Sequence, residues 1–277
     1  MKLFATIITV KVHWGYSIRT FPASASQRSF SIPPSTTIVG ALAYAYASVN
    51  NINREYSTIE YPFTNYVSEF IEEFGINYAT VHLPEPIYEH SFQTIRYFTM
   101  PVQAPKTDVE RFSETLKIAE MFNPIQIGYM VCSTLTSTLI ILSEKPIPKA
   151  IMWSILRLGS KESMVSVQDA YQEEVQPIEV SEGDIIHIVN TSYISDLAEP
   201  QPPANYIVER MPTPITRDEW LRWYSFKLHP TVLERNVIIP LPEVFTSVRI
   251  LKPSYKFTIT SRNKQLITII PKEALKK

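Results

Sequence analysis

Two adjacent prolines followed by three hydroxyl residues constrain the fold of this chain more than any other segment. Pro33 and Pro34 keep the backbone extended and bias each preceding residue away from helix, so a helix cannot begin before Ser35. Ser35 is the expected N-cap, its hydroxyl accepting from a backbone N–H of the first turn. The apolar run that follows predicts a helix over residues 36 to about 49, covered on most sides.

The start of this helix has the features of an anion site. Ser35, Thr36 and Thr37 place hydroxyls at the positive end of the helix dipole. The loop before it is basic and carries Arg19 and Arg28. A phosphate would find free backbone donors, hydroxyls and positive charge together there. The alternative is an ordinary capped helix, which is a far commoner feature than a phosphate site.

Composition excludes several classes of protein. The 277 residues are 45% hydrophobic, which is enough for a buried core and for two small domains. The formal net charge of −1 at pH 7 means that contact with nucleic acid would depend on local basic patches. The six glycines form neither glycine-rich loop of nucleotide-binding proteins. The lone cysteine, Cys132, excludes a disulfide framework or a cysteine-based zinc site and is expected to be a buried strand residue.

The ends of the chain and its histidines point to a cytoplasmic protein without cofactors. The first residues run into an apolar stretch with neither the features of a signal peptide nor the length of a membrane span. We therefore expect a cytoplasmic location and no membrane contact. The five histidines are scattered without metal-ligand spacing, so we expect no metal and no cofactor.

Residues 1–170 show the order strand, helix, strand, insertion, strand, helix, strand. The predicted strands cover residues 3–12, 78–83, 127–142 and 164–168, the third being one extended strand or a bent pair. The second helix is predicted over residues 147–158 and ends at Gly159, the expected C′ residue. This is the βαββαβ plan of a ferredoxin-like or RRM-like sheet, so the fold class is α+β.

Residues 171–277 have a different texture, with short β-like runs between proline-rich turns. The predicted strands there are residues 184–190, 205–210, 221–228, 247–251, 256–260 and 265–270. We predict a smaller β-rich domain packed on the first.

The insertion at residues 91–123 mixes cations with aromatic residues. Arg96, Lys106 and Arg111 lie among phenylalanines and tyrosines. Guanidinium and aromatic faces stack on splayed RNA bases, which makes RNA binding the functional interpretation. Solvated loop charges are the ordinary alternative.

Two segments together resemble one family. Residues 31–42, S-I-P-P-S-T-T-I-V-G-A-L, resemble the P-P-[ST]-T-x-x-G-[AL]-L segment of the CRISPR-associated RAMP proteins of the fifth Cas family. Residues 155–163, I-L-R-L-G-S-K-E-S, resemble the later L-G-[RK]-x-[ES] segment of that family, which closes a helix and enters a strand. The resemblance covers residues 1–170, and length and composition favour the archaeal type I-A version.

The resemblance implies a role in antiviral defence. Such a subunit caps the 5′ handle of a CRISPR RNA (crRNA) in the Cascade surveillance complex and contacts the backbone and large subunits. It meets target DNA only through the complex. A thumb projects from the RRM-like domain in this family, and residues 91–123 lie at the corresponding place.

The residues expected to bind RNA come from the basic loop, the helix start, the insertion and the second motif. They are Arg19, Arg28, Ser35, Thr36, Thr37, Arg96, Lys106, Arg111, Arg157, Gly159, Ser160 and Lys161. For Arg157 and Lys161 the alternative is compensation of the dipole at a helix C-terminus.

Catalysis is the main alternative function. Some relatives in this family cut precursor RNA with a metal-independent set of Tyr, Lys and His. No adjacent Lys-His pair occurs in the middle of this chain, although Tyr44, Tyr46, His82 and His90 leave a combination conceivable. We expect a non-catalytic subunit, with an endoribonuclease as the second reading and a structural protein that binds a small phosphorylated ligand as the third.

Overall fold

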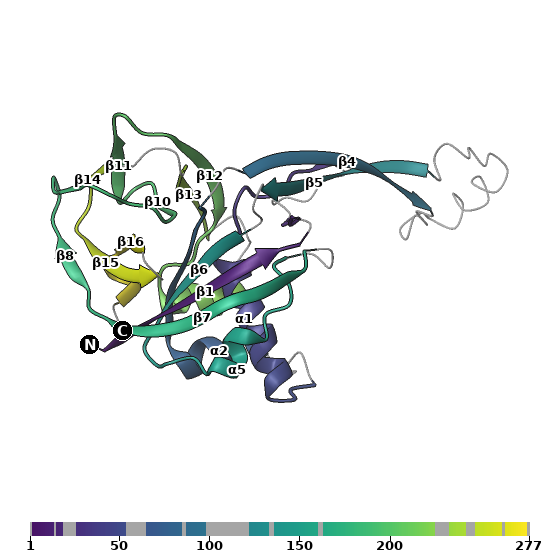
Figure 1. Ribbon diagram of the computed structural model, residues 1–277, viewed down its shortest axis with the longest axis horizontal. Coiled ribbons are helices and arrows are strands. Elements are labelled where there is room, and N and C mark those ends of the chain that lie inside the picture. The colour runs from purple at the N-terminus through teal and green to yellow at the C-terminus, as the bar shows by residue number, and fades with distance from the viewer. Residues whose placement is uncertain are drawn as a thin grey trace.

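The computed structural model is a body from which a two-stranded arm projects (Figure 1). It describes residues 2–13, 15–18, 26–53, 65–84, 87–97, 122–132, 136–159, 163–224, 233–241, 247–261 and 264–275. The described residues form a mixed structure of helices and strands in which strands predominate. Within these ranges no helix has the length and apolar character needed to cross a bilayer.

A four-stranded sheet organises the first half of the chain. Its strands are β1 (Leu3–Val12), β3 (Ile76–His82), β6 (Thr136–Ser143) and β7 (Val165–Val175). They lie in the order β3-β6-β1-β7, and every neighbouring pair is antiparallel. Ile7 of β1 lies opposite Ile140 on one side and Tyr171 on the other. The predicted strands at residues 3–12, 78–83 and 164–168 are therefore confirmed.

Both faces of this sheet are covered. Alternation along β1 sends Ile8, Val10 and Val12 to the face covered by the helices α1 (Ser35–Val49), α2 (Tyr66–Phe74) and α5 (Lys149–Trp153) (Figure 1). Leu3, Ala5 and Ile7 point to the opposite face. There they meet Phe257, Ile259 and Leu266 of the second half.

The arm is an antiparallel hairpin of β4 (Ile87–Tyr97) and β5 (Phe122–Cys132) (Figure 1). The short strand β2 (Ser26–Gln27) pairs in parallel with β5. Reciprocal backbone hydrogen bonds of 3.0 and 2.8 Å between Tyr16 and Met130 join the base of the arm to the body. The predicted insertion at residues 91–123 begins and ends in this hairpin. The run at residues 127–142 is divided between β5 and β6, which lie in different sheets.

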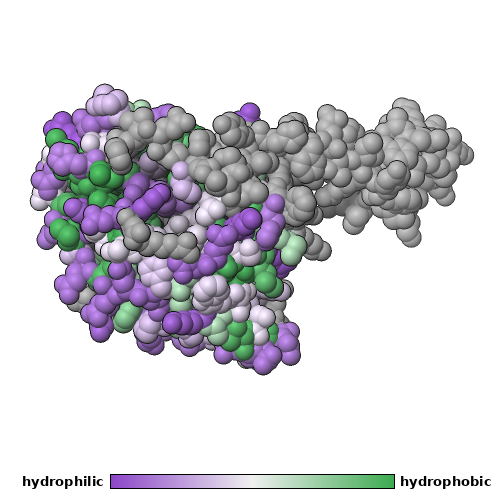
Figure 2. Space-filling model, in the orientation of Figure 1, coloured by the Kyte–Doolittle hydropathy of each residue, from purple (hydrophilic) through white to green (hydrophobic). Residues whose placement is uncertain are grey.

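The second half consists of small three-stranded antiparallel sheets. One sheet contains β16 (Lys264–Pro271), β15 (Ser254–Ser261) and β8 (Ile178–Val180). Another contains β11 (Ala198–Gln201), β14 (Ser247–Ile250) and β9 (Ile185–Ile186). A third contains β10 (Tyr193–Ile194), β13 (Glu234–Pro240) and β12 (Tyr206–Pro212). Two helical elements accompany them, α6 (Arg217–Tyr224) and the 3-10 helix η2 (Lys272–Leu275). The face seen in Figure 2 mixes hydrophilic residues with small hydrophobic groups, as is ordinary for the surface of a folded protein.

Two helices occur where the sequence interpretation had none. Helix α2 lies in a segment for which no element was predicted, and Asn65 caps it by accepting from the N–H groups of Val67 and Ser68. Helix α6 contains residues 221–224 of the strand predicted at residues 221–228, and the rest of that prediction lies outside the described residues. Thr216 and Glu219 form a capping arrangement at its start, since the Glu219 N–H donates to Thr216 Oγ1 and Glu219 Oε2 accepts from the Ile215 N–H.

The helix predicted over residues 147–158 is shorter than expected. Helix α5 ends at Trp153, and the residues that follow pair as an extended chain with the start of β7. The Leu158 N–H donates to Ser163 O, and the Val165 N–H donates to Leu156 O. Gly159, with a φ of 94°, therefore lies beyond the end of α5 and not at the C′ position of a helix. The chain before it pairs with the start of β7 instead of continuing the helix.

Candidate functional site

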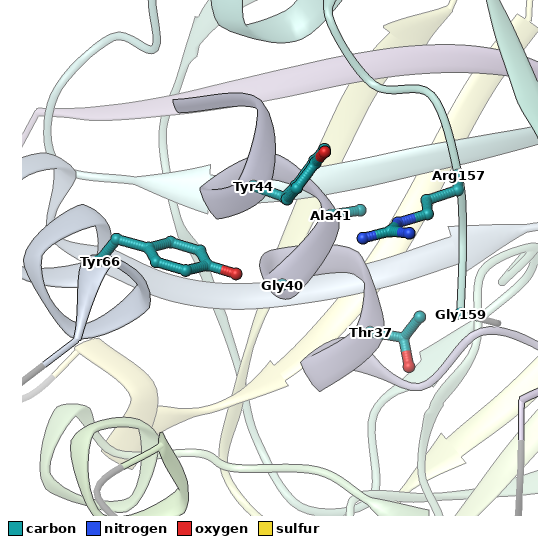
Figure 3. Close-up of a pocket in the computed structure, with 7 residues that line it drawn as sticks. All are labelled: Thr37, Gly40, Ala41, Tyr44, Tyr66, Arg157 and Gly159. Carbon is teal, nitrogen blue, oxygen red and sulfur yellow. The ribbon is translucent and has the colours of Figure 1, made fainter. Parts of the chain in front are cut away.

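The two family-like segments meet at one surface pocket (Figure 3). The pocket has a volume of about 280 Å³. The residues that line it are Thr37, Gly40, Ala41, Tyr44, Tyr66, Arg157 and Gly159. A segment that begins α1 and a turn that precedes β7 thus build one site, although they lie far apart in the sequence.

Helix α1 supplies the floor of the pocket. Thr37, Gly40, Ala41 and Tyr44 follow the i, i+3, i+4, i+7 spacing that places residues on one helix face. This face is open to solvent, whereas Ile38 and the other core-facing residues of α1 are buried. Because Gly40 and Ala41 are so small, the middle of the floor lies close to the helix backbone.

Arg157 and Tyr44 form a stacked pair at the edge of the pocket. The guanidinium carbon of Arg157 lies 4.7 Å from the centroid of the Tyr44 ring, within cation–π range. Within the described part of the chain, Arg157 makes no hydrogen bond or ion pair. None of the described lining residues is acidic, so the guanidinium keeps its donors for a ligand or for water.

Gly159 allows the second motif to approach the basic loop. A Cβ atom on Gly159 would lie 2.6 Å from Ile18 Cγ1 and 3.1 Å from the carbonyl oxygen of Ser17. The contact is reinforced by a 2.9 Å hydrogen bond from the Ser17 N–H to Ser163 Oγ. Glycine is therefore required both for the backbone angle and for the space.

Tyr224 connects the start of α1 to the second half of the chain, and Tyr66 lines the pocket. The Tyr224 hydroxyl donates to the carbonyl oxygen of Thr36 at 2.5 Å, and burial raises its pKa well above the ordinary value. Tyr224 is therefore a neutral donor at any physiological pH. Tyr66 extends from α2 toward the floor of the pocket at Gly40 (Figure 3).

The predicted anion site at the helix start needs correction. Pro34 is the N-cap residue, Ser35 is the first helical residue, and no side chain caps the helix. Ser35 is buried and its hydroxyl donates to the carbonyl oxygen of Pro212 at 3.3 Å. Thr36 is buried as well. The second half of the chain covers both residues, so only Thr37 of the three lines the pocket.

The remaining predicted residues are distributed over the loop, the arm and the turn. Arg28 is exposed in the loop before α1 and does not line the pocket. Arg96 lies on β4 in the arm. Arg157 and Gly159 line the pocket, and Arg157 lies beyond the end of α5, so compensation of that helix's dipole does not explain it. The others lie outside the described residues: Arg19, Lys106, Arg111, Ser160 and Lys161.

Sequence reasoning missed Tyr66, Gly40 and Ala41 as site residues. The helix that presents Tyr66 carries a recognisable signal, since Asn65 stands at its N-cap and Gly75 adopts a φ of 62° at its C-cap. The position of Gly40 on the pocket-lining face of α1 became visible only with the fold.

The described members of the conceivable catalytic set do not gather in one place. The Tyr46 hydroxyl donates to Glu73 at 2.6 Å, and burial together with this carboxylate raises the pKa of Tyr46 to about 12. His82 Nδ1 lies 2.6 Å from the carbonyl oxygen of Asn190, and burial lowers the pKa of His82. Tyr44 lines the pocket, whereas the side chain of His90 lies outside the described residues. The described part of the chain contains no group of three His, Cys, Asp or Glu residues suited to a metal.

Comparison with known proteins identifies relatives in archaea, although no family model matches the chain. CRISPR-associated protein Cas5 2 of Saccharolobus solfataricus is 28% identical over 184 residues, which cover 64% of this chain and 63% of that protein. CRISPR system aCascade subunit Cas5 1 of the same organism is 27% identical over 177 residues, covering 62% of this chain and 66% of that protein. The matches thus span less than two thirds of these relatives' length.

A solved structure shares the fold. A CRISPR protein from Archaeoglobus fulgidus, known from its crystal structure, superposes with a TM-score of 0.54 at 19% identity. The superposition covers 96% of this chain and 99% of that one. The chain is therefore a relative of the archaeal Cas5 proteins, which confirms the family resemblance predicted from its two motifs.

Proposed function

We propose that this protein is a non-catalytic subunit of a Cascade-type complex that binds and caps the 5′ handle of the crRNA. The observation that carries the proposal is the pocket at which both Cas5-like segments meet, lined by Thr37 and by the uncompensated Arg157. One of the relatives is named as a Cascade subunit, which supports assembly with backbone and large subunits.

The topology supports the finer fold assignment. The order β3-β6-β1-β7, with helices in both crossovers and all neighbours antiparallel, is what a βαββαβ ferredoxin-like RAMP domain requires. In this assignment the hairpin of β4 and β5 is the thumb, and the second domain, predicted over residues 171–277, begins after β7, which ends at Val175. The hairpin projects from the body that carries the pocket, so it offers RNA a second surface to contact.

A direct binding assay tests the proposal. The purified chain should bind repeat-derived 5′-handle RNA weakly alone and more tightly with its backbone partner, and prefer the handle to a scrambled RNA of equal length. Affinities are compared across a salt series, because the logarithm of a binding constant that depends on phosphate contacts falls linearly with the logarithm of the salt concentration. Equal affinity for handle and scrambled RNA, with and without the partner, would refute the proposal.

Two adjacent threonines form a matched pair for this assay. Thr37→Val removes a hydroxyl from the pocket and should weaken handle binding severalfold, whereas Thr36→Val alters a residue covered by the second half and should not. Equal effects of the two substitutions would contradict a handle site in the pocket.

A metal-independent endoribonuclease is the second candidate, because Tyr44 lines the pocket. Such an enzyme needs a base to deprotonate the 2′-hydroxyl and a cation beside the phosphate. Incubation with repeat RNA in EDTA distinguishes the two functions: we expect intact RNA, and cleavage would favour the enzyme. A thermal shift with mononucleotides but not with RNA would favour a small phosphorylated ligand instead.

A further inference from the structure

We propose that the pocket on α1 holds a single unpaired nucleobase, stacked against the Tyr44–Arg157 pair, and not only the RNA backbone. The inference rests on the proposed RNA-binding function and specifies which part of the nucleotide the pocket takes. It assigns base contact to Tyr44, Tyr66 and Arg157, whereas the sequence pattern had indicated a phosphate at the helix start.

The shape of the pocket suits a flat group. Gly40 and Ala41 form a floor without large side chains, and Tyr66 and Arg157 stand on opposite sides of it (Figure 3). Tyr44 lies toward one end and Thr37 toward the other (Figure 3). A volume of about 280 Å³ leaves room for one nucleotide-sized ligand.

The chemistry of the pocket also favours a base over a phosphate. Tyr44 is 40% exposed, which leaves aromatic surface available for stacking. Arg157 adds a planar face and N–H donors that fit the acceptors on a base edge. The part of the helix start best suited to a phosphate is covered, because Ser35 and Thr36 are buried.

Another cation–π pair in the molecule, between Lys272 and Tyr255, serves as a comparison because its cation is paired with a carboxylate. Lys272 lies 5.7 Å from the centroid of the Tyr255 ring, but its charge is neutralised by a direct contact with Glu179. Arg157 has no such carboxylate among the described residues. The Arg157–Tyr44 pair therefore keeps a free charge and a free plane beside a pocket, as a ligand site requires.

The test uses the full chain and two kinds of RNA probe in fluorescence anisotropy. One probe is a fully abasic ribose-phosphate octamer, and the others are the same octamer with one central base, in four versions. Stacking of one base on an aromatic side chain strengthens binding of single strands by about tenfold. We expect at least one base-bearing octamer to bind the wild-type protein about tenfold more tightly than the abasic octamer.

Five variants locate this gain, one of them Arg157→Ala, which removes both the charge and the plane of the guanidinium. Tyr44→Ala removes the ring, and Arg157→Lys keeps the positive charge but loses the planar fork. Both should abolish the tenfold gain while binding of the abasic octamer and its salt dependence stay unchanged. Tyr44→Phe keeps the ring and should keep the gain. Tyr206→Ala, at a tyrosine of similar exposure (42%) on β12 outside the pocket lining, is the matched control and should also keep it.

The outcomes separate this inference from the function on which it rests. Equal binding of abasic and base-bearing octamers by the wild-type protein overturns the base pocket and leaves RNA binding intact. Retention of the gain in Arg157→Lys, with loss only in Arg157→Ala, also overturns it, because charge alone would then suffice. If no octamer binds and the handle RNA does not bind either, the proposed function itself fails. Circular dichroism spectra of all variants confirm that each is folded.

Discussion

Gly159 has a positive φ of 94°, and Ile18 occupies the space that a Cβ atom on Gly159 would need. Gly159→Ala should destabilise the protein by about 2–4 kcal/mol, from the strained backbone and from the clash with Ile18. Gly183 is a matched control, since its φ is 89° but no atom lies within 4 Å of a Cβ built there. Gly183→Ala should cost about 1 kcal/mol. Urea unfolding measures both, and equal costs would show that the contact with Ile18 contributes nothing.

His82 contacts Asn190 of the second half, and its titration makes the free energy of unfolding depend on pH. Burial, the largest effect, and nearby Lys264 lower the pKa of His82, while its hydrogen bond to Asn190 O opposes them. Because the folded pKa lies below the ordinary 6.5, the unfolded chain binds the proton more readily. The contribution of His82 to stability is therefore full above pH about 6.5 and is lost as pH falls through the folded pKa.

The prediction is a fall in the free energy of unfolding between pH 7 and pH 5 that is smaller in His82→Asn. Asparagine keeps an N–H donor for the carbonyl of Asn190 but does not titrate. Denaturant unfolding at several pH values gives the two curves. Parallel curves would show that His82 is not the group responsible.

At the scale of elements, α2 positions Tyr66 and depends on one capping residue. Asn65 Oδ1 accepts from two backbone N–H groups, and its Nδ2 donates to Tyr224 O at 2.8 Å. Asn65→Ala should cost about 1–2 kcal/mol in thermal or urea unfolding. Asn65→Asp keeps the cap acceptor and loses only the donor, so a cost equal to that of Asn65→Ala would contradict the capping role.

We predict that the outer part of the arm contributes little to the stability of the body. The described connections of the arm to the body all lie at its base: the bridge between Tyr16 and Met130, the short pairing of β2 with β5, and the Met130 side chain, which is buried in the core. Gln93 and Gln126 are cross-strand partners, so residues 94–125 can be replaced by Asn-Gly to close a short hairpin. We expect an unchanged melting temperature and weaker binding of handle RNA. A large fall in the melting temperature would show that the arm supports the core.

The whole molecule is held together by a core that both halves share. Met211, Trp220, Val237 and Ile239 of the second half join the cluster beneath α1 and α2. Trp220 is fully buried, and its Nε1 donates to the carbonyl oxygen of Asn77 at 3.4 Å. Trp220→Ala should cost about 3–5 kcal/mol. Because the core is shared, calorimetry of the wild-type chain should show one unfolding transition; two separate transitions would contradict this coupling.

Local physical chemistry in the sequence was enough to predict the elements whose signals are strong. The prolines set the start of α1 at Ser35, and β-branched runs marked β1, β3 and β7. Short elements were harder to predict, because their caps count for more than their periodicity. Asn65 with Gly75, and Thr216 with Glu219, carried signals for α2 and α6 that periodicity did not reveal.

The sequence by itself determined the long elements α1, β1, β3 and β7, the near-neutral charge and the two segments that resemble Cas5 proteins. Only the tertiary structure decided which side chains of those segments face a ligand. Ser35 and Thr36 lie at the start of α1, but the second half of the chain covers them, whereas Thr37 stays open beside Arg157. The reason is physical: hydroxyl and guanidinium groups are chosen locally, but their burial depends on contacts between residues far apart in the chain, and no local pattern encodes those contacts.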